Sequence, residues 1–398
     1  MPRFPFFDTL PPPCNCVRSH IGYTFFFPWL DDFYTPNNES WKSMYPGEII
    51  DWREVHLLYV TKDLNNETAH TVTTIIVPAN TDRLLSGLQV GAVGPALSWN
   101  MMSLSFVQPF VREDGPTLNT PDYEGWNAAF TVGPQTAYHT IDSLRVPDAR
   151  TVMFGFSGGV YATEWASETQ PTYAPELHQI AGAAMGGPPP NIANTYLYCN
   201  GGEWAELNVW AMLGYMDKDL LNKHRNEFYG PKKRCTRCFG KDEVPPSLAY
   251  RDISSFFENG DSFLYKFREM LDHISVMGRR GAPKFPMFIY QGTNDKIVDP
   301  IEVANNLVRD LCEKGTNVRY RQFPDLNHMQ TLVVGAPYVW SWIANVLDGW
   351  PTVPGCRERD LNPRIGRSED GLLSEMDEDL VREYSLLASQ IPVRNELR

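Results

Sequence analysis

The sequence predicts an α/β protein built on a central, mostly parallel β-sheet. Apolar, β-branched segments alternate along the chain with segments whose apolar residues follow helical spacing. A glycine-rich pentapeptide, Gly155-Phe156-Ser157-Gly158-Gly159, lies between one such strand and one such helix. The chain has 398 residues, of which 42% are hydrophobic. This composition supplies a large core and excludes a wholly disordered protein.

The individual elements are predicted from periodicity and from turn residues. Residues 55–61 and 70–79 predict a hairpin, because both runs are apolar and β-branched and a polar turn separates them. A strand followed by a glycine loop is expected within 84–97, whereas residues 106–120 fit a core strand poorly. Later strands are expected at 151–156, 180–187, 285–292 and 317–324, and helices at 158–170, 300–315 and 335–349. Pro171 is expected to end the first of these helices.

Composition divides the chain into three parts. Residues 1–30 are rich in proline and aromatic residues and are expected to be irregular. Residues 31–356 are predicted to form the folded domain, with an aromatic, charged and helical insertion at about 190–283. The charged tail, 357–398, is predicted to contain an amphipathic helix, whose apolar face would hold Leu372, Leu373, Met376, Leu380, Tyr384, Leu387 and Ile391. We expect this helix to dock on the domain or, as the alternative, to bind a partner.

Charge argues against nucleic acid as a partner, and hydropathy argues against a transmembrane helix. The formal net charge is −13, and an acidic surface repels the phosphates of nucleic acids. No apolar run reaches the length of about 18 residues that a transmembrane helix needs. Prolines and charges also interrupt the first 20 residues before the apolar core of a signal peptide forms.

The cysteines give a weak indication of metal or redox chemistry. Their number is seven, so at least one thiol is unpaired within the chain. Cys235 and Cys238 have the spacing of a zinc or redox motif, but no second pair of ligands follows them. We therefore expect no metal site, and we interpret the two residues as a loop pair, either bridged or free.

The pentapeptide has the Gly-x-Ser-x-Gly pattern of a nucleophile elbow. A serine hydroxyl is exposed for attack when it stands on a tight turn, and the turn needs small neighbours such as Gly155 and Gly159. The helix that follows directs its N–H groups toward Ser157, so the Gly158 N–H is expected to stabilise an oxyanion. The alternative is a glycine-rich turn that only joins a strand to a helix.

A nucleophilic serine requires a base, and the base requires an acid that orients it. In α/β-hydrolases these residues follow the serine in the order Asp or Glu, then His. Four histidines follow the serine, namely His178, His224, His273 and His328. His328 lies in the predicted loop before the last helix, where this order requires the base.

Three aspartates compete for the role of the acid. Asp295 lies in a turn directly after the predicted strand 285–292 and is the first candidate. Asp299, four residues later, is the second candidate, and Asp325 is too close to His328 in the sequence. The expected triad is therefore Ser157, Asp295 and His328, with each residue in a successive loop.

Several long segments resemble the fungal secretory lipase family, which includes the yeast lipase A type. The matching stretches are 31–36, 71–80, 121–145, 155–177, 284–300 and 310–337. The resemblance covers residues 30–356 and implies an α/β-hydrolase fold in which the insertion at 190–283 is a cap over an acyl-binding tunnel. It also implies the triad Ser157, Asp295 and His328 and the hydrolysis of carboxylic esters. The mechanism of such a triad requires no cofactor and no metal.

The resemblance implies further features and reveals departures. Cys312 and Cys356 stand where the family has a disulfide, and a bridge favours an oxidising compartment. The family also implies secretion, whereas the first 20 residues do not have the pattern of a signal peptide. The compartment is therefore left open between secreted and intracellular. The loop that helps to build the oxyanion hole lacks the family's Tyr-Glu-Asp and reads Gly91-Ala92-Val93. A main-chain N–H at Gly91 or Ala92 is the expected second oxyanion donor.

The sequence thus favours a serine carboxylic ester hydrolase, either a lipase or an esterase of a small metabolite. Cap aromatics that are candidates for a lipid tunnel are Trp204, Trp210, Tyr215, Phe256 and Phe257. The alternative interpretation is that they form the cap's own packing, which leaves the acyl chain length open. A different hypothesis is a hydrolase-fold protein of fungal secondary metabolism with weak catalysis that binds or assembles a metabolite. The expected partner is an ester substrate, and the oligomeric state is left open.

Overall fold

The structure is a computed structural model, and it describes residues 52–78, 86–90, 116–126, 128–145, 150–215, 248–256 and 259–360. All of them belong to the larger of the two units into which the chain divides, Asp51–Arg398. Five predictions lie outside the described residues: the irregular segment 1–30, the oxyanion loop at Gly91 and Ala92, the Cys235–Cys238 pair, the cap aromatic Phe257, and the amphipathic helix of the tail.

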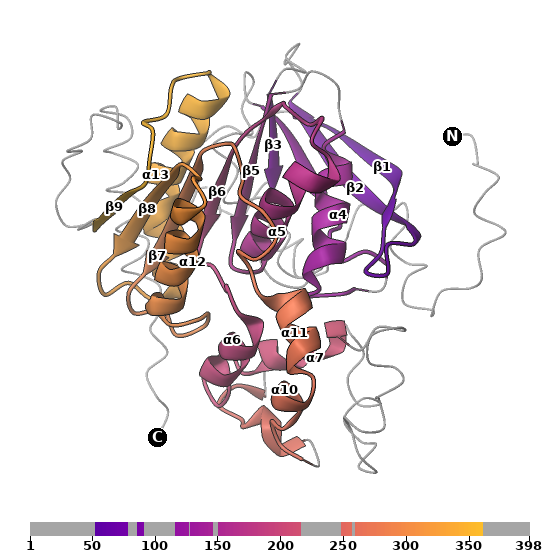
Figure 1. Cartoon of the computed structure of the whole chain (residues 1–398), viewed down its shortest axis with the longest axis vertical. Helices are drawn as coiled ribbons and strands as arrows, with labels where there is room; N and C mark the ends of the chain where they lie inside the picture. The colour runs from indigo at the N-terminus through magenta and orange to yellow at the C-terminus, as the bar shows by residue number, and fades with distance from the viewer. Residues whose placement is uncertain are drawn as a thin grey trace, which may run out of the picture. The chain divides into compact units, whose positions relative to one another are not determined.

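The described residues form a nine-stranded sheet in the order β1-β2-β4-β3-β5-β6-β7-β8-β9 (Figure 1). The strands are β1 (Trp52–Lys62), β2 (Thr68–Pro78), β3 (Ser86–Val90), β4 (Thr117–Pro121), β5 (Arg150–Phe156), β6 (Ile180–Gly186), β7 (Met287–Gly292), β8 (Val318–Phe323) and β9 (Arg357–Asp360). The pairs β1–β2 and β2–β4 are antiparallel. All other strand pairs of the sheet are parallel. The predicted hairpin and the predicted mostly parallel sheet are therefore confirmed.

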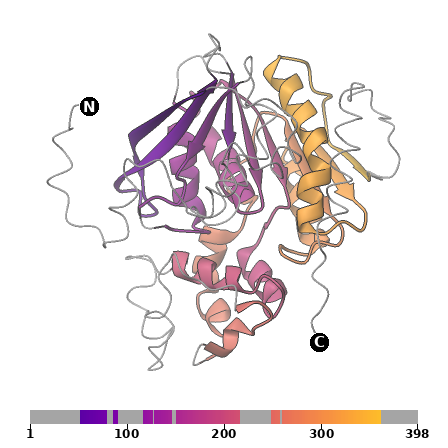
Figure 2. The same cartoon turned by 180° about the vertical axis from the view of Figure 1, so that it is seen from behind.

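Helices cover both faces of this sheet (Figures 1 and 2). On one face lie α4 (Gly133–Ser143), α5 (Gly158–Tyr173) and α12 (Ile301–Glu313). The long helix α13 (His328–Leu347) covers the other face, where it contacts β5, β6 and β7. Each face has its own cluster of buried side chains, around Trp165 on the α5 side and around Trp342 on the α13 side. This burial fixes the ends of the central strands, from which the candidate site is built.

The segment between β6 and β7 leaves the sheet and forms helices, as expected for the predicted helical insertion. Its described elements are α6 (Ile192–Cys199), α7 (Glu206–Tyr215), the short 3₁₀ helix η5 (Ile253–Phe256), α10 (Phe263–Lys266) and α11 (Arg268–Ser275). They gather beyond the end of the sheet toward which the parallel strands point (Figure 1). Among the described residues, no helix combines the length and the apolarity that crossing a membrane requires.

One prediction was wrong for the described part of its segment, which forms an interior strand of the sheet. The segment 106–120 fits a core strand poorly by its sequence, yet Thr117–Pro121 forms β4 between β2 and β3. Pairing on both sides outweighs the weak strand propensity of the segment. The polar Asn119 is accommodated because its side chain accepts a hydrogen bond from Thr73 Oγ1 at 2.5 Å and donates one to Ser143 Oγ at 2.9 Å.

Two helix boundaries also differ from the predictions. Helix α5 ends at Tyr173, so Pro171 lies inside its last turn and does not stop it. Helix α13 begins at His328, seven residues before the predicted start. The signal that the apolar pattern misses is a capping box, in which the Asn327 side chain accepts from Gln330 N and the Gln330 side chain accepts from Asn327 N.

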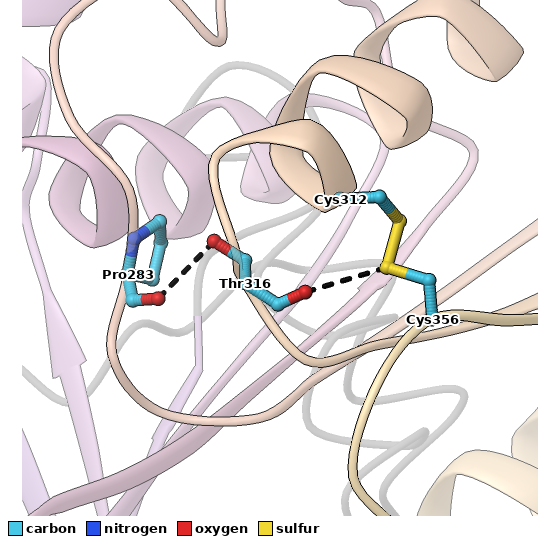
Figure 3. The surroundings of a disulfide bond; sticks show 4 residues. All are labelled: Pro283, Cys312, Thr316 and Cys356. Atoms are coloured by element: carbon cyan, nitrogen blue, oxygen red, sulfur yellow. Dashed lines mark hydrogen bonds between the residues drawn. A yellow bond between two sulfur atoms is a disulfide. The ribbon is translucent and has the colours of Figure 1, made fainter.

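A disulfide joins Cys312, in the last turn of α12, to Cys356, directly before β9 (Figure 3). Thr316 lies beside it, and its carbonyl oxygen is 3.3 Å from Cys356 Sγ. The Thr316 hydroxyl donates to the carbonyl oxygen of Pro283 at 3.2 Å, at the end of the cap segment. The bridge that the family resemblance implies thus fastens the last strand to the body, and the first four residues of the predicted tail belong to the sheet.

Candidate active site

Ser157 occupies the sharp turn between β5 and α5. Its backbone has φ 54° and ψ −117°, a left-handed conformation that is costly for a residue with a side chain. The turn brings the helix so close to the strand that only glycine fits at position 155. A Cβ atom added there would lie 2.1 Å from the Gly159 carbonyl oxygen. The Ser157 N–H donates to the carbonyl oxygen of Gly186 in the neighbouring strand at 2.8 Å. These constraints give Ser157 the geometry of a nucleophile elbow.

The N-terminus of α5 supplies the candidate oxyanion donor. Gly158 is the first residue of the helix, where main-chain N–H groups have no acceptor within the helix. The positive end of the helix dipole therefore lies beside the serine. The second expected donor, at Gly91, is outside the described residues.

His328 and Asp295 form a buried pair. Their Nδ1 and Oδ2 atoms are 2.6 Å apart, and each residue is only 4% exposed. The other carboxylate oxygen, Asp295 Oδ1, accepts hydrogen bonds from the N–H groups of Ile297 at 2.9 Å and Val298 at 3.3 Å. Both oxygens of the carboxylate thus have a partner, and Nδ1 is the ring nitrogen of His328 that faces it.

Packing places the His328 ring next to the elbow. The ring lies 4.8 Å, between centroids, from the ring of Phe156, the residue that precedes Ser157. It also lies against Gly187, where an added Cβ atom would be 2.7 Å from His328 Cε1. Because Gly187 follows the residue that accepts from the Ser157 N–H, the imidazole and the serine share one edge of the sheet. The sequence reasoning missed this role of Gly187.

The structure separates the candidate acids. Asp299 has a different hydrogen-bond partner: its Oδ2 accepts from the main-chain N–H of Asn191 at 2.7 Å, at the start of the cap. Asp299 is fully buried, and this burial, together with the negative charge of Asp295, raises its pKa to about 7. Asp325 is exposed. Of the three aspartates, therefore, Asp295 is the one in contact with the imidazole.

Sequence reasoning also missed two buried carboxyl groups on the elbow helix. Glu164 and Glu168 are one turn apart on α5, and both are fully buried. Burial raises the pKa of both groups, and for Glu164 the charge of Glu168 adds to the rise. Glu168 Oε2 accepts from the main-chain N–H of Arg280 at 2.9 Å, and the Arg280 guanidinium lies 3.8 Å above the Trp165 ring. These contacts fasten the elbow helix to the segment that leads from the cap to β7.

The family model for "Secretory lipase" matches residues 100–355, which is more than half of the chain. The chain belongs to the secretory lipase family. Trichothecene C-3 esterase from Fusarium sporotrichioides is 32% identical over 77% of this chain and 78% of its own length. Lipase A from Arthroderma benhamiae is 30% identical over 76% of this chain and 72% of its own length. The similarity confirms that this secretory lipase family member is a carboxylic ester hydrolase.

A solved structure confirms the fold. Lipase A from Candida antarctica aligns with a TM-score of 0.72 over 90% of this chain and 96% of its own, at 23% sequence identity. The fold is thus that of an α/β-hydrolase, as the sequence predicts.

The buried Asp299 predicts a pH dependence of stability in this family member. Its folded-state pKa, about 7, lies above the ordinary value of 3.8. Between these values the folded protein holds a proton that the unfolded chain releases, so the free energy of unfolding decreases as the pH rises, and the decrease ends above about pH 7. Asp299→Asn retains an acceptor for the Asn191 N–H and has no proton to lose. We therefore expect the unfolding free energy of the wild type to fall relative to that of Asp299→Asn over this window.

Urea unfolding at a series of pH values measures the difference. Asp325→Asn makes the same chemical change at an exposed position and serves as the control. A difference between wild type and Asp299→Asn that stays constant, or grows in favour of the wild type, as the pH rises from about 4 to 7 would contradict this interpretation of the buried carboxyl group.

Proposed function

We propose that this protein hydrolyses carboxylic esters through a Ser157–His328–Asp295 triad and an acyl-enzyme intermediate. The observation that carries the proposal is the buried 2.6 Å contact between His328 Nδ1 and Asp295 Oδ2, packed against a turn that holds Ser157 at φ 54°. The serine is then the nucleophile, the imidazole is the general base, and the carboxylate orients the imidazole and stabilises its positive charge.

The reaction proceeds in two halves. Ser157 Oγ attacks the ester carbonyl carbon while His328 Nε2 takes the hydroxyl proton. The C–O bond to the alcohol then breaks, the alcohol leaves with the proton from His328, and the acyl group remains on Ser157. A water molecule attacks this acyl-enzyme, its proton passes to His328, and the serine regains a proton as the carboxylic acid leaves.

Negative charge on the carbonyl oxygen in each tetrahedral intermediate needs fixed donors. We assign the Gly158 N–H at the start of α5 as one donor, and a main-chain N–H at Gly91 or Ala92 as the other. Loss of one such donor typically lowers the rate by about a hundred- to a thousandfold. The chemistry requires neither a cofactor nor a metal ion.

The relatives indicate two substrate classes, a lipid ester and an ester of a small metabolite. Three of the five cap aromatics belong to the protein's own packing and do not favour the lipid: Tyr215 is buried, and Trp210 and Phe256 pack against the core. The relative at 32% identity is named as a trichothecene C-3 esterase, which favours an ester of a small metabolite as the second candidate substrate class for this chain.

Hydrolysis of p-nitrophenyl esters from acetate to palmitate tests the proposal. We expect turnover by the wild type and a loss of at least about a thousandfold in kcat for Ser157→Ala, because the variant has no nucleophile. Ser262→Ala is the matched control and should keep full activity. Ser262 is exposed in the cap, and its side chain makes no capping hydrogen bond to helix α10.

The chain-length profile decides between the substrate classes, since a maximum at acetate or butyrate indicates a small-ester hydrolase and a maximum at long chains indicates a lipase. Full turnover by Ser157→Ala, or no turnover by well-folded wild type with any ester, would contradict the proposed mechanism.

A second prediction concerns the space that Gly187 leaves for the base. Gly187→Ala places a methyl group against His328 and displaces the ring, and a displacement near 1 Å lowers kcat/KM by roughly a hundredfold. Gly201→Ala is the control, because Gly201 has a similar positive φ of 75° but no atom lies within 4 Å of an added Cβ. Steady-state ester hydrolysis compares them, and equal losses in the two variants would show that backbone strain alone is responsible.

A further inference from the structure

The turn that carries the proposed acid is held by the cap. Tyr198, in the last turns of α6, donates its hydroxyl proton to the main-chain carbonyl oxygen of Asp295 at 3.1 Å. The next residue of the turn, Lys296, contacts the same tyrosine: its Nζ is 3.3 Å from the hydroxyl oxygen and 5.8 Å from the centroid of the ring. One cap side chain thus contacts two consecutive residues, Asp295 and Lys296, of the turn formed by residues 295–299.

A second contact joins the other end of α6 to the other end of the turn. The Asn191 N–H donates to Asp299 Oδ2 at 2.7 Å, while the Asn191 side chain caps α6 by accepting from the N–H groups of Ala193 and Asn194. Because Asp299 is fully buried, this hydrogen bond is shielded from water and is stronger than the same bond exposed to solvent. Helix α6 therefore holds the turn at residues 295 and 299.

The residues between these two anchors fix the carboxylate itself. The N–H groups of Ile297 and Val298 donate to Asp295 Oδ1, and this leaves Oδ2 for His328. The position of the carboxylate is thus set by the conformation of residues 295–299. A change in α6 that shifts this turn necessarily shifts the oxygen on which the imidazole depends.

We propose that Tyr198 is a positioning residue, through which the cap helix α6 holds Asp295 in the orientation that His328 requires. The inference rests on the proposed catalytic triad and deepens it. Tyr198 acts on the reaction only through the main chain of Asp295. Its loss should therefore lower the rate of the chemical step and leave the binding of a small ester unchanged.

The test is Tyr198→Phe, which keeps the ring and removes only the hydroxyl group. We expect kcat for p-nitrophenyl acetate to fall about three- to tenfold, the effect of one hydrogen bond, with KM within about twofold of the wild type. The rate is expressed per active serine, titrated with a fluorophosphonate, so that an unfolded fraction does not affect the comparison.

Tyr265→Phe is the matched control, since Tyr265 is an exposed tyrosine of the same cap and should retain the kcat of the wild type. An unchanged kcat in Tyr198→Phe, or an increase in KM without a loss of kcat, would overturn the inference. Ser157→Ala, measured in parallel, separates the two claims. If it retains turnover, the proposed triad fails; if it is inactive and Tyr198→Phe matches Tyr265→Phe, only the positioning role fails.

Discussion

The parallel main-chain ladder of β5, β6, β7 and β8 is the constraint on which the candidate site depends. Its register pairs Phe156 with Gly186, Gly186 with Tyr290, and Gly292 with Phe323. The ends of four strands therefore meet at one edge, and the residues that follow them come together although up to 171 positions separate them in the sequence. Parallel strands make this unavoidable, because their carboxyl ends point the same way.

Buried groups at that edge convert the register into a defined geometry. The small residues at 155 and 187 let a helix and an imidazole approach the backbone, and the hydrogen bonds to Asp295 hold both of its oxygens. Such a site tolerates little change, because each atom is placed by a neighbour that is itself buried. In the account proposed above, the cap takes part in this placement as well as covering the site.

The elbow and the alternation of strands and helices were predictable because they depend on local chemistry. Gly-x-Ser-x-Gly specifies a tight turn within five residues, and apolar runs specify buried strands. The choice between Asp295 and Asp299 was not predictable from spacing alone, since both stand in the same turn and only the fold shows which carboxylate contacts His328. The strand β4 escaped the sequence analysis for a related reason: its partners, not its residues, make it a strand. The contacts of Gly187 and Tyr198 are equally non-local and left no signal in the sequence.

The most direct test of the central claim is to identify the residue that a fluorophosphonate modifies in the native wild-type protein, by mass spectrometry of its peptides. The account predicts a single phosphonate adduct on Ser157 and no adduct when the protein is unfolded in urea before the reagent is added, because the hydroxyl is reactive only beside His328 and Asp295. An adduct on another residue, or no adduct on the native protein, would contradict the claim that these three residues form the catalytic site.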